Sequence, residues 1–434
     1  MTEKELIAVE KAGHVRWYVL ALIVIASFIA YILRTNVSIA GETMMKDLGF
    51  SEIELGFVLS AFAWGYAIFQ FPGGIFGDIF GSRKGIAVIA VSWGILTVFT
   101  GLIPGPQMAS VTVILVLLMT VRFLVGMTHA PTFPIIGRAI ADWFPVSGWG
   151  FPNGLTSAGL SLGAAATGPL IVWLIEKVGW RGSFFWTSPL GLLIAIIWWW
   201  YVRDYPWQHR GVNRAECDLI DANRPRAGVE REKGIWKIAV KNREILLLTA
   251  SYFCMNYVFY LFFSWIFYYL VEVRGFSDQQ AGVLNSVLWL GAAAGAVIGG
   301  VLCDRFVRRY GARSGYRLLP VPSLLLSAGL LVAGAFAQDG YQAVILFSVS
   351  FGFLQLTDSV YWAAMTSVSG RHAAAAGGVM NTGGNAVGGV GALLVPLAAK
   401  YFGWTAAVAT GSIFAVIAAT LWLFIRADKP MTSE

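Results

Sequence analysis

The chain has 434 residues, of which 57% are hydrophobic and only 13% are charged. A water-soluble protein carries about twice that charged fraction, so the composition excludes an ordinary soluble enzyme or binding domain. The net charge of +7 needs no nucleic-acid partner, because the basic residues follow the pattern of a membrane topology.

Twelve apolar runs are long enough to cross a bilayer as helices, which takes about 20 residues each. The alternative is a bundle of core helices in a large soluble protein. Such helices would carry polar stripes, and most of these runs lack them. We therefore predict an all-α membrane protein with twelve transmembrane helices, at 17–41, 53–76, 84–103, 110–137, 152–176, 182–202, 245–271, 279–303, 316–337, 342–368, 372–400 and 404–426.

The distribution of Lys and Arg predicts the orientation. If the N-terminus is cytoplasmic, the inner segments hold 24 of the 31 basic residues, and two lie inside apolar runs. This positive-inside pattern places both termini in the cytoplasm and the protein in the inner (plasma) membrane. The first fifteen residues lack a cleavage site, so we expect no removable signal peptide. The outer loops hold the other five basic residues, Lys46, Lys177, Arg181, Arg274 and Lys400.

A polar stretch at 203–244 divides the chain into an N-terminal bundle, 1–202, and a C-terminal bundle, 245–434, of six helices each. We treat this stretch as a cytoplasmic linker. Its segment "RAECDLIDANR" places two apolar residues among charges, which predicts a short helix lying on the membrane surface.

The two halves repeat each other's sequence. "GGIFGDIFGSRKG" after the second run is echoed by "GGVLCDRFVRRYG" after the eighth, with Asp78 and Asp304 226 residues apart. "GLTSAG" at Gly154 and "GVMNTG" at Gly378 are separated by 224 residues. Because the two repeated motifs are separated by nearly the same number of residues, we predict two pseudo-symmetric six-helix bundles with a binding site at their interface.

"GGIFGDIFGSRK" resembles the signature loop of the major facilitator superfamily, G-x-L-x-D-x-x-G-x-[RK]-[RK]. Within that superfamily, "YILRTNVSIA", "FAWGYAIFQFPGG", "RFLVGMTHAPTFP", "GWRGSFF" and "SWIFYYLVEVRGFS" resemble the anion:cation symporters. These include bacterial galactonate, hexuronate and glucarate permeases, and animal sialin and vesicular glutamate transporters. The resemblance implies alternating access and symport of an organic anion with protons.

Two arginines interrupt the apolar runs. A charge at the centre of an isolated transmembrane helix costs on the order of 3 kcal/mol, so Arg34 and Arg122 should face the bundle interior. By helix rise they lie about 9 Å and about 18 Å from the outer ends of their helices, close enough to share one cavity. No acid lies within a turn of either, and a guanidinium suits a carboxylate or phosphate. The alternative is that both bond helix-end carbonyls; the resemblance implies that they hold the substrate anion.

The chain departs from the family at the expected proton carriers. The resemblance implies an Asp just before Arg34 and a Glu in the fourth helix, but Leu33 and His129 stand there. His129 lies two turns from Arg122 on the same face. Because imidazole titrates near neutral pH, it is a candidate proton carrier. The alternative is a neutral histidine hydrogen-bonded between helices.

Asp358, deep in the run 342–368, is the second candidate for proton coupling. An unpaired buried carboxylate is protonated part of the time. By helix rise it lies at a depth similar to that of His129. The alternative is that Asp358 caps or bridges nearby helix backbone.

Further polar side chains are candidates for the cavity wall, because a hydroxylated substrate needs donors and acceptors among apolar groups. For any single Tyr of the seventh helix, packing or an interfacial position is the alternative. The candidates are Tyr31, Tyr66, Ser161, Asn256, Tyr257, Tyr260 and Asn385.

The signature loop is interpreted as a cytoplasmic gate rather than a binding site. The resemblance implies that the acid and bases of this loop, Asp78, Arg83 and Lys84, latch helix ends on the cytoplasmic side. Asp142 is the expected partner of Arg83. The second-half copy, which includes Asp304 and Arg305, is expected to act in the same way, although some of its arginines only anchor the inner face.

We therefore expect a secondary transporter of a small organic, sugar-acid-like carboxylate, monomeric in the lipid bilayer. Uniport, exchange or export of another anion, and a sensor with a transporter fold, are the alternatives. The four histidines and three cysteines show no spacing typical of metal ligands or of a nucleophile with its base, so we expect no enzyme activity and no cofactor.

Overall fold

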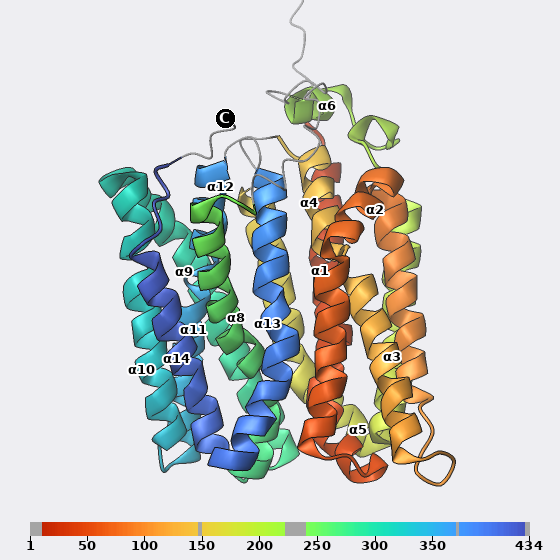
Figure 1. The fold of residues 1–434 in the computed structure, drawn as a ribbon. Coiled ribbons are helices and arrows are strands. Elements are labelled where there is room, and N and C mark those ends of the chain that lie inside the picture. Colours follow the sequence, from red (N-terminus) through yellow and green to blue (C-terminus); the bar gives the residue numbers. More distant parts are fainter. Residues whose placement is uncertain (1–10, 146–149, 222–239, 370–372, 430–434) are drawn as a thin grey trace, which may run out of the picture.

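The computed structural model describes residues 11–145, 150–221, 240–369 and 373–429. Within these ranges all regular elements are helices, as the composition predicted (Figure 1). They are α1 (Val15–Leu48), α2 (Glu52–Gly101), α3 (Val111–His129), α4 (Thr132–Trp143), α5 (Gly150–Tyr201), a 3₁₀ turn (Pro206–Gln208), α6 (Arg214–Asp221), α8 (Arg243–Tyr268), a π-helical turn (Tyr269–Val273), α9 (Asp278–Leu318), α10 (Pro320–Phe336), α11 (Gly340–Gln355), α12 (Asp358–Ser369), α13 (Ala373–Phe402) and α14 (Trp404–Trp422).

Among the described residues, 11 helical segments are long and apolar enough to cross a membrane. One of them, Phe151–Tyr201, has 51 residues, and its backbone leaves the helical region at Gly179, with φ 73° and ψ 170°. The long helices α2 and α9 break in the same way, at Gly81 and Gly311. Positive φ is strained for residues that carry a Cβ, which is why glycine stands at these bends.

The end of α1 and the start of α2 repeat near the start of α9. The sequence G-F-S occurs at 49–51 and again at 275–277, with φ 73° at Gly49 and 71° at Gly275. Ser51 and Ser277 each close a capping box with the Glu or Gln three positions on. The caps satisfy amide groups that have no partner inside the helix. Two helix starts 226 residues apart therefore share one local design.

The helices form two groups, α1–α5 on one side and α8–α14 on the other (Figure 1). Of the two larger apolar cores, one contains only residues up to Val202, while the second joins residues from both groups, such as Tyr31 and Trp289. The groups also meet where α5 crosses α9: a Cβ on Gly168 would lie 2.6 Å from the carbonyl oxygen of Gly282. Small residues allow this close approach between helices.

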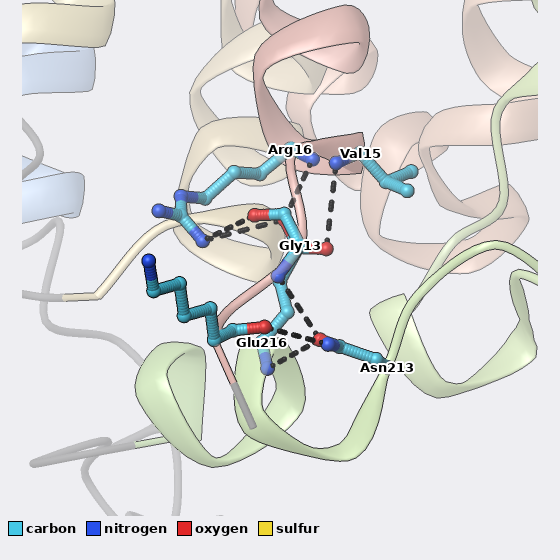
Figure 2. A network of polar contacts seen from close by, with 6 residues as sticks. Gly13, Val15, Arg16, Asn213 and Glu216 are labelled. Atoms are coloured by element: carbon cyan, nitrogen blue, oxygen red, sulfur yellow. Dashed lines mark hydrogen bonds and ion pairs between the residues drawn. The ribbon is translucent and has the colours of Figure 1, made fainter. Parts of the chain in front are cut away.

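The linker helix α6 docks on the start of α1, as Figure 2 shows. Glu216 accepts hydrogen bonds from the backbone N–H groups of Val15 and Arg16, and it pairs with the Arg16 guanidinium at 3.3 Å. Asn213 accepts from the backbone N–H of Gly13. A carboxylate is favourable at a helix N-terminus, so Glu216 supplies the cap that α1 lacks from its own sequence. The expected short helix is present, and one of its faces covers α1. We call this end of the molecule the linker end.

Polar contacts join the two groups at the opposite end, where α1 ends and α2 begins. Lys46 bridges Glu42 of its own helix and Glu272, which lies 3.1 Å away just after α8. The Tyr268 hydroxyl donates to Glu52 at 2.6 Å. These contacts hold the two groups together at the opposite end.

Candidate functional site

The structure brings the two intramembrane arginines together. Arg34 in α1 is 3% exposed and Arg122 in α3 is 2% exposed. Helix α1 extends beyond its predicted end, to Leu48, so Arg34 lies about 21 Å from that end instead of about 9 Å. Arg122 lies about 17 Å from the start of α3. The two side chains thus share one depth, and the Nη2 atom of Arg122 donates to the backbone carbonyl of Arg34 at 3.3 Å.

Aromatic rings surround the guanidinium of Arg34. Each such contact is worth about 0.5–2 kcal/mol, which offsets part of the cost of burying a charge. Arg122 shares one of these rings, because its guanidinium carbon lies 4.9 Å from the Phe62 centroid. The rings nearest to Arg34 are Tyr66 at 4.5 Å, Phe263 at 5.0 Å, Phe62 at 5.1 Å and Tyr31 at 5.2 Å.

Donor capacity remains on both arginines. Among the described residues, neither forms an ion pair with an acid, and the Nε atoms of Arg34 and Arg122 have no hydrogen-bond partner. The alternative was that both arginines bond helix carbonyls. Arg122 makes one such contact, to the carbonyl of Arg34, but the Nε donors of both arginines remain without a partner among the described residues. Two like charges with free N–H groups in a buried, aromatic setting form a site suited to an anion.

A chain of hydrogen bonds leads from Arg34 across both helix groups. Arg34 donates to the Tyr260 hydroxyl at 3.2 Å, and Tyr260 donates to Asn385 Oδ1 at 2.9 Å. Asn385 donates to Asn381 Oδ1 at 2.8 Å, and Asn381 donates to Gln70 Oε1 at 3.2 Å. Tyr260 and Asn385 were predicted as site residues. Gln70 and Asn381 were not. The spacing of Asn381 and Asn385 by four residues is a signal that would have found Asn381, whereas no pattern in the sequence pointed to Gln70.

Asp358 is the first residue of α12, directly after the break that ends α11 at Gln355. The Tyr252 hydroxyl donates to its Oδ1 at 3.1 Å. A carboxylate in the first turn of a helix is favoured by the helix dipole, so the alternative expectation of a helix-capping role fits this position as well. Asp358 is half-buried.

His129 ends α3 in an aromatic setting. Its ring stacks on Trp93 with centroids 4.7 Å apart and meets the edge of Phe62 at 6.0 Å. Within the part of the chain that the structure describes, its Nε2 atom has no hydrogen-bond partner. The Phe62 ring contacts the imidazole and both guanidiniums, so the three side chains meet at one aromatic ring.

The remaining predicted wall residues differ in their placement. The Ser161 hydroxyl donates to a carbonyl of its own helix, and Asn256 does the same toward Tyr252. Tyr257 shares a hydrogen bond with Thr410 and stacks on α14, which agrees with the packing alternative. Tyr31 and Tyr66 lie against Arg34 as described above.

The expected contact between Arg83 and Asp142 is not formed. Arg83 donates through Nε and Nη2 to the carbonyl of Trp199, and its backbone N–H donates to Asp204 at 2.8 Å. The bend at Gly81 causes this difference, because it turns the following residues toward the linker side chain of Asp204. Asp204 was not among the predicted residues.

Asp142 lies 3.4 Å from Arg138, one turn earlier in α4. Arg138 also donates to the carbonyl of Gly77 at 2.8 Å, so it ties α4 to the signature loop. Lys84 and Arg305 are exposed. The predicted gate acids Asp78 and Asp304 have side chains outside the described part of the structure.

Together, the apolar helices and the buried cationic site between two helix groups define a membrane transporter. The chain belongs to the Major Facilitator Superfamily, whose profile matches residues 23–392. It is a transporter and not an enzyme.

Among its relatives is a probable sulfoacetate transporter of Cupriavidus necator, 33% identical over 85% of this chain and 84% of the relative. A probable galactarate/D-glucarate transporter of Bacillus subtilis is 31% identical over 88% and 86%, respectively. A solved bacterial homologue of the human lysosomal transporter Spinster, in an inward-facing and unoccupied conformation, shares the fold with a TM-score of 0.78. It is 18% identical and covers 96% of this chain and 98% of its own.

Proposed function

We propose that this protein is a secondary transporter of a small organic anion. The observation that carries the proposal is the buried pair Arg34 and Arg122, which offers free guanidinium donors without a neighbouring acid among the described residues. The names of the relatives support a carboxylate or sulfonate substrate, because sulfoacetate, galactarate and D-glucarate are all acids.

The anion site lies between two halves that rock about it. We assign the halves to residues 1–202 and 245–434, joined by the linker 203–244, and count twelve crossings in all. Support for this count comes from the bend at Gly179, since a 51-residue segment is about 77 Å long and a bilayer core is about 30 Å thick. The basic linker end faces the cytoplasm of a monomer in the inner membrane.

Protons are the proposed coupling ion, with Asp358 and His129 as carriers. Asp358 is the stronger candidate, because the hydroxyl of Tyr252 holds its carboxylate beside α8, the helix that carries Tyr260. His129 shares the Phe62 ring with the arginines. Uniport or anion exchange is the alternative, and it follows if neither residue carries a proton.

The linker-end gate is proposed to consist of the signature loop held by Arg138 and Asp204. Both residues bond the backbone near the bend at Gly81. A loop tied to α4 on one side and to the linker on the other transmits movement between them.

Uptake into proteoliposomes tests the proposed function. The purified chain should accumulate at least one radiolabelled acid from a panel of sugar acids, sulfonates and aromatic acids, faster than liposomes that contain the Arg34→Ala variant. Failure of every acid to accumulate would favour a sensor with a transporter fold.

A further inference from the structure

The hydrogen-bond chain that begins at Arg34 has a fixed direction. A guanidinium has only donors, so the Tyr260 hydroxyl must accept a hydrogen bond from Arg34. Its own O–H group then donates a hydrogen bond to Asn385. The carbonyl oxygen of Asn385 is then used, and its NH₂ group donates to Asn381. By the same logic, the NH₂ group of Asn381 donates to the side-chain oxygen of Gln70.

The chain therefore ends on a donor. Gln70 is 6% exposed, its oxygen is already an acceptor, and its Nε2 atom has no hydrogen-bond partner among the described residues. Burying an amide donor without a partner is unfavourable, because its hydrogen bond to water is lost and not replaced. The unpartnered polar atoms of this network, Arg34 Nε, Arg122 Nε and Gln70 Nε2, are all donors.

The arginine pair and Gln70, which carry the unpartnered donors, lie at different depths in the bundle. Asn381 and Asn385 are one turn apart in α13, which is about 6 Å along the helix axis. Gln70 accepts a hydrogen bond from Asn381, while Arg34 is connected to Asn385 through the hydroxyl of Tyr260. Since α2 runs from the opposite end toward the linker end, Gln70 lies on the linker side of the arginines.

We propose that Gln70 forms a second subsite, which binds an acceptor oxygen at the other end of a two-ended acid. The inference rests on the proposed function and adds the substrate class to it. The arginines hold one oxyanion, and Nε2 of Gln70 donates to a carboxylate, sulfonate or carbonyl oxygen about one helical turn away. Asn381 is a positioning residue, because it holds the oxygen of Gln70 and leaves the NH₂ group facing the ligand.

The preference for an acceptor follows from the N–H donors of Gln70 Nε2, which have no partner among the described residues. A terminal hydroxymethyl group offers a weaker, neutral acceptor, and a methyl group offers none. Hydrogen bonds to charged groups are stronger than those to neutral groups. A two-ended acid should therefore bind more tightly than a one-ended acid of equal length.

Calorimetric titration of the purified full-length protein tests this subsite. Two length-matched pairs serve as probes: galactarate with galactonate, and adipate with hexanoate. The substitutions are Gln70→Met, which keeps the shape without the amide, and Gln70→Glu, which adds a repelling charge. Gln342→Leu is the control, because Gln342 is exposed in the first turn of α11.

We expect the wild type to bind the two-ended acid of at least one pair about ten-fold more tightly than its partner. Gln70→Met should remove this preference while changing the Kd of the one-ended acid less than about two-fold, and Gln70→Glu should reverse it. Equal affinities in the wild type, or an unchanged preference in both variants, would overturn the subsite and indicate a buried water on Gln70. Those results leave the anion site standing, whereas binding of all four acids that is indifferent to Arg34→Ala would overturn the proposed function itself.

Discussion

Arg122 donates a hydrogen bond to the backbone carbonyl of Arg34, and the Phe62 ring lies against both guanidiniums. This contact orients one arginine by the main chain of the other and leaves the Nε atoms of both without partners in the described part of the chain. Two positive charges this close are unfavourable until an anion neutralises them. The structure thus contains a site whose electrostatics favour occupation.

Tyr260 should tune the affinity of this site. Its hydroxyl accepts from Arg34 and donates to Asn385, so Tyr260→Phe removes two hydrogen bonds and leaves the ring in place. We expect the Kd of the transported acid to rise about five- to ten-fold, equivalent to about 1 kcal/mol. Tyr257→Phe is the control from the same helix, because that hydroxyl bonds Thr410. Equal losses in both variants would contradict the role of Tyr260.

Asp358→Asn should uncouple uptake from protons, if Asp358 carries them. The amide keeps a hydrogen-bond acceptor for Tyr252 but cannot take up a proton. An imposed pH gradient should then drive uptake at least about ten-fold less well than in the wild type, a barrier change of about 1.4 kcal/mol, while exchange of labelled for unlabelled acid continues. His129→Gln, measured in the same assay, should have a smaller effect. Unchanged coupling in both variants would exclude these two residues as proton carriers.

Lys46 should control opening at the end opposite the linker. Lys46→Gln removes the ion pair with Glu272 that crosses between the halves. Exposed pairs are worth about 0–1 kcal/mol, so the open population should rise by up to about five-fold. Spin labels at Lys177 and Tyr341, in a background without the native cysteines, report the separation of the halves. Lys400→Gln is the control, and the same distance distribution in both variants would contradict the latch.

Glu216 should stabilise the protein without affecting the substrate. Glu216→Gln weakens the cap on α1 and its contact with Arg16, and we expect the thermal midpoint to fall by a few degrees. The KM of uptake should stay within about two-fold, since the linker helix lies away from the arginines. Asp218→Asn, on the exposed face of α6, should leave the midpoint unchanged. A fall of the same size in Asp218→Asn would contradict a specific cap.

The sequence predicted the parts of the fold that depend on hydrophobicity and local geometry. Long apolar runs became helices, because hydrophobicity and length act within one helix. The bends at Gly81, Gly179 and Gly311 were not predicted. Arg34 and Arg122 were predicted as a pair, since a charge in lipid must face the interior. Tyr260 was predicted to face the same site, and its hydroxyl bonds Arg34.

The parts that depend on the rotation of one helix against another were not predicted. Gln70 contributes to the site only because α2 crosses α13, and a single sequence does not contain that crossing. The expected pairing of Arg83 with Asp142 is not formed in this structure, for a related reason. The bend at Gly81 directs the backbone of Arg83 to Asp204, and Arg138 lies beside Asp142.

The most direct test of the anion site is the affinity of one transported acid and of its uncharged amide for the wild type, Arg34→Gln and Arg122→Gln. We predict that each substitution weakens binding of the acid at least about 100-fold, or about 2.7 kcal/mol, and that the amide binds the wild type as weakly as the acid binds the variants. Wild-type affinity for the acid in both variants would contradict the account.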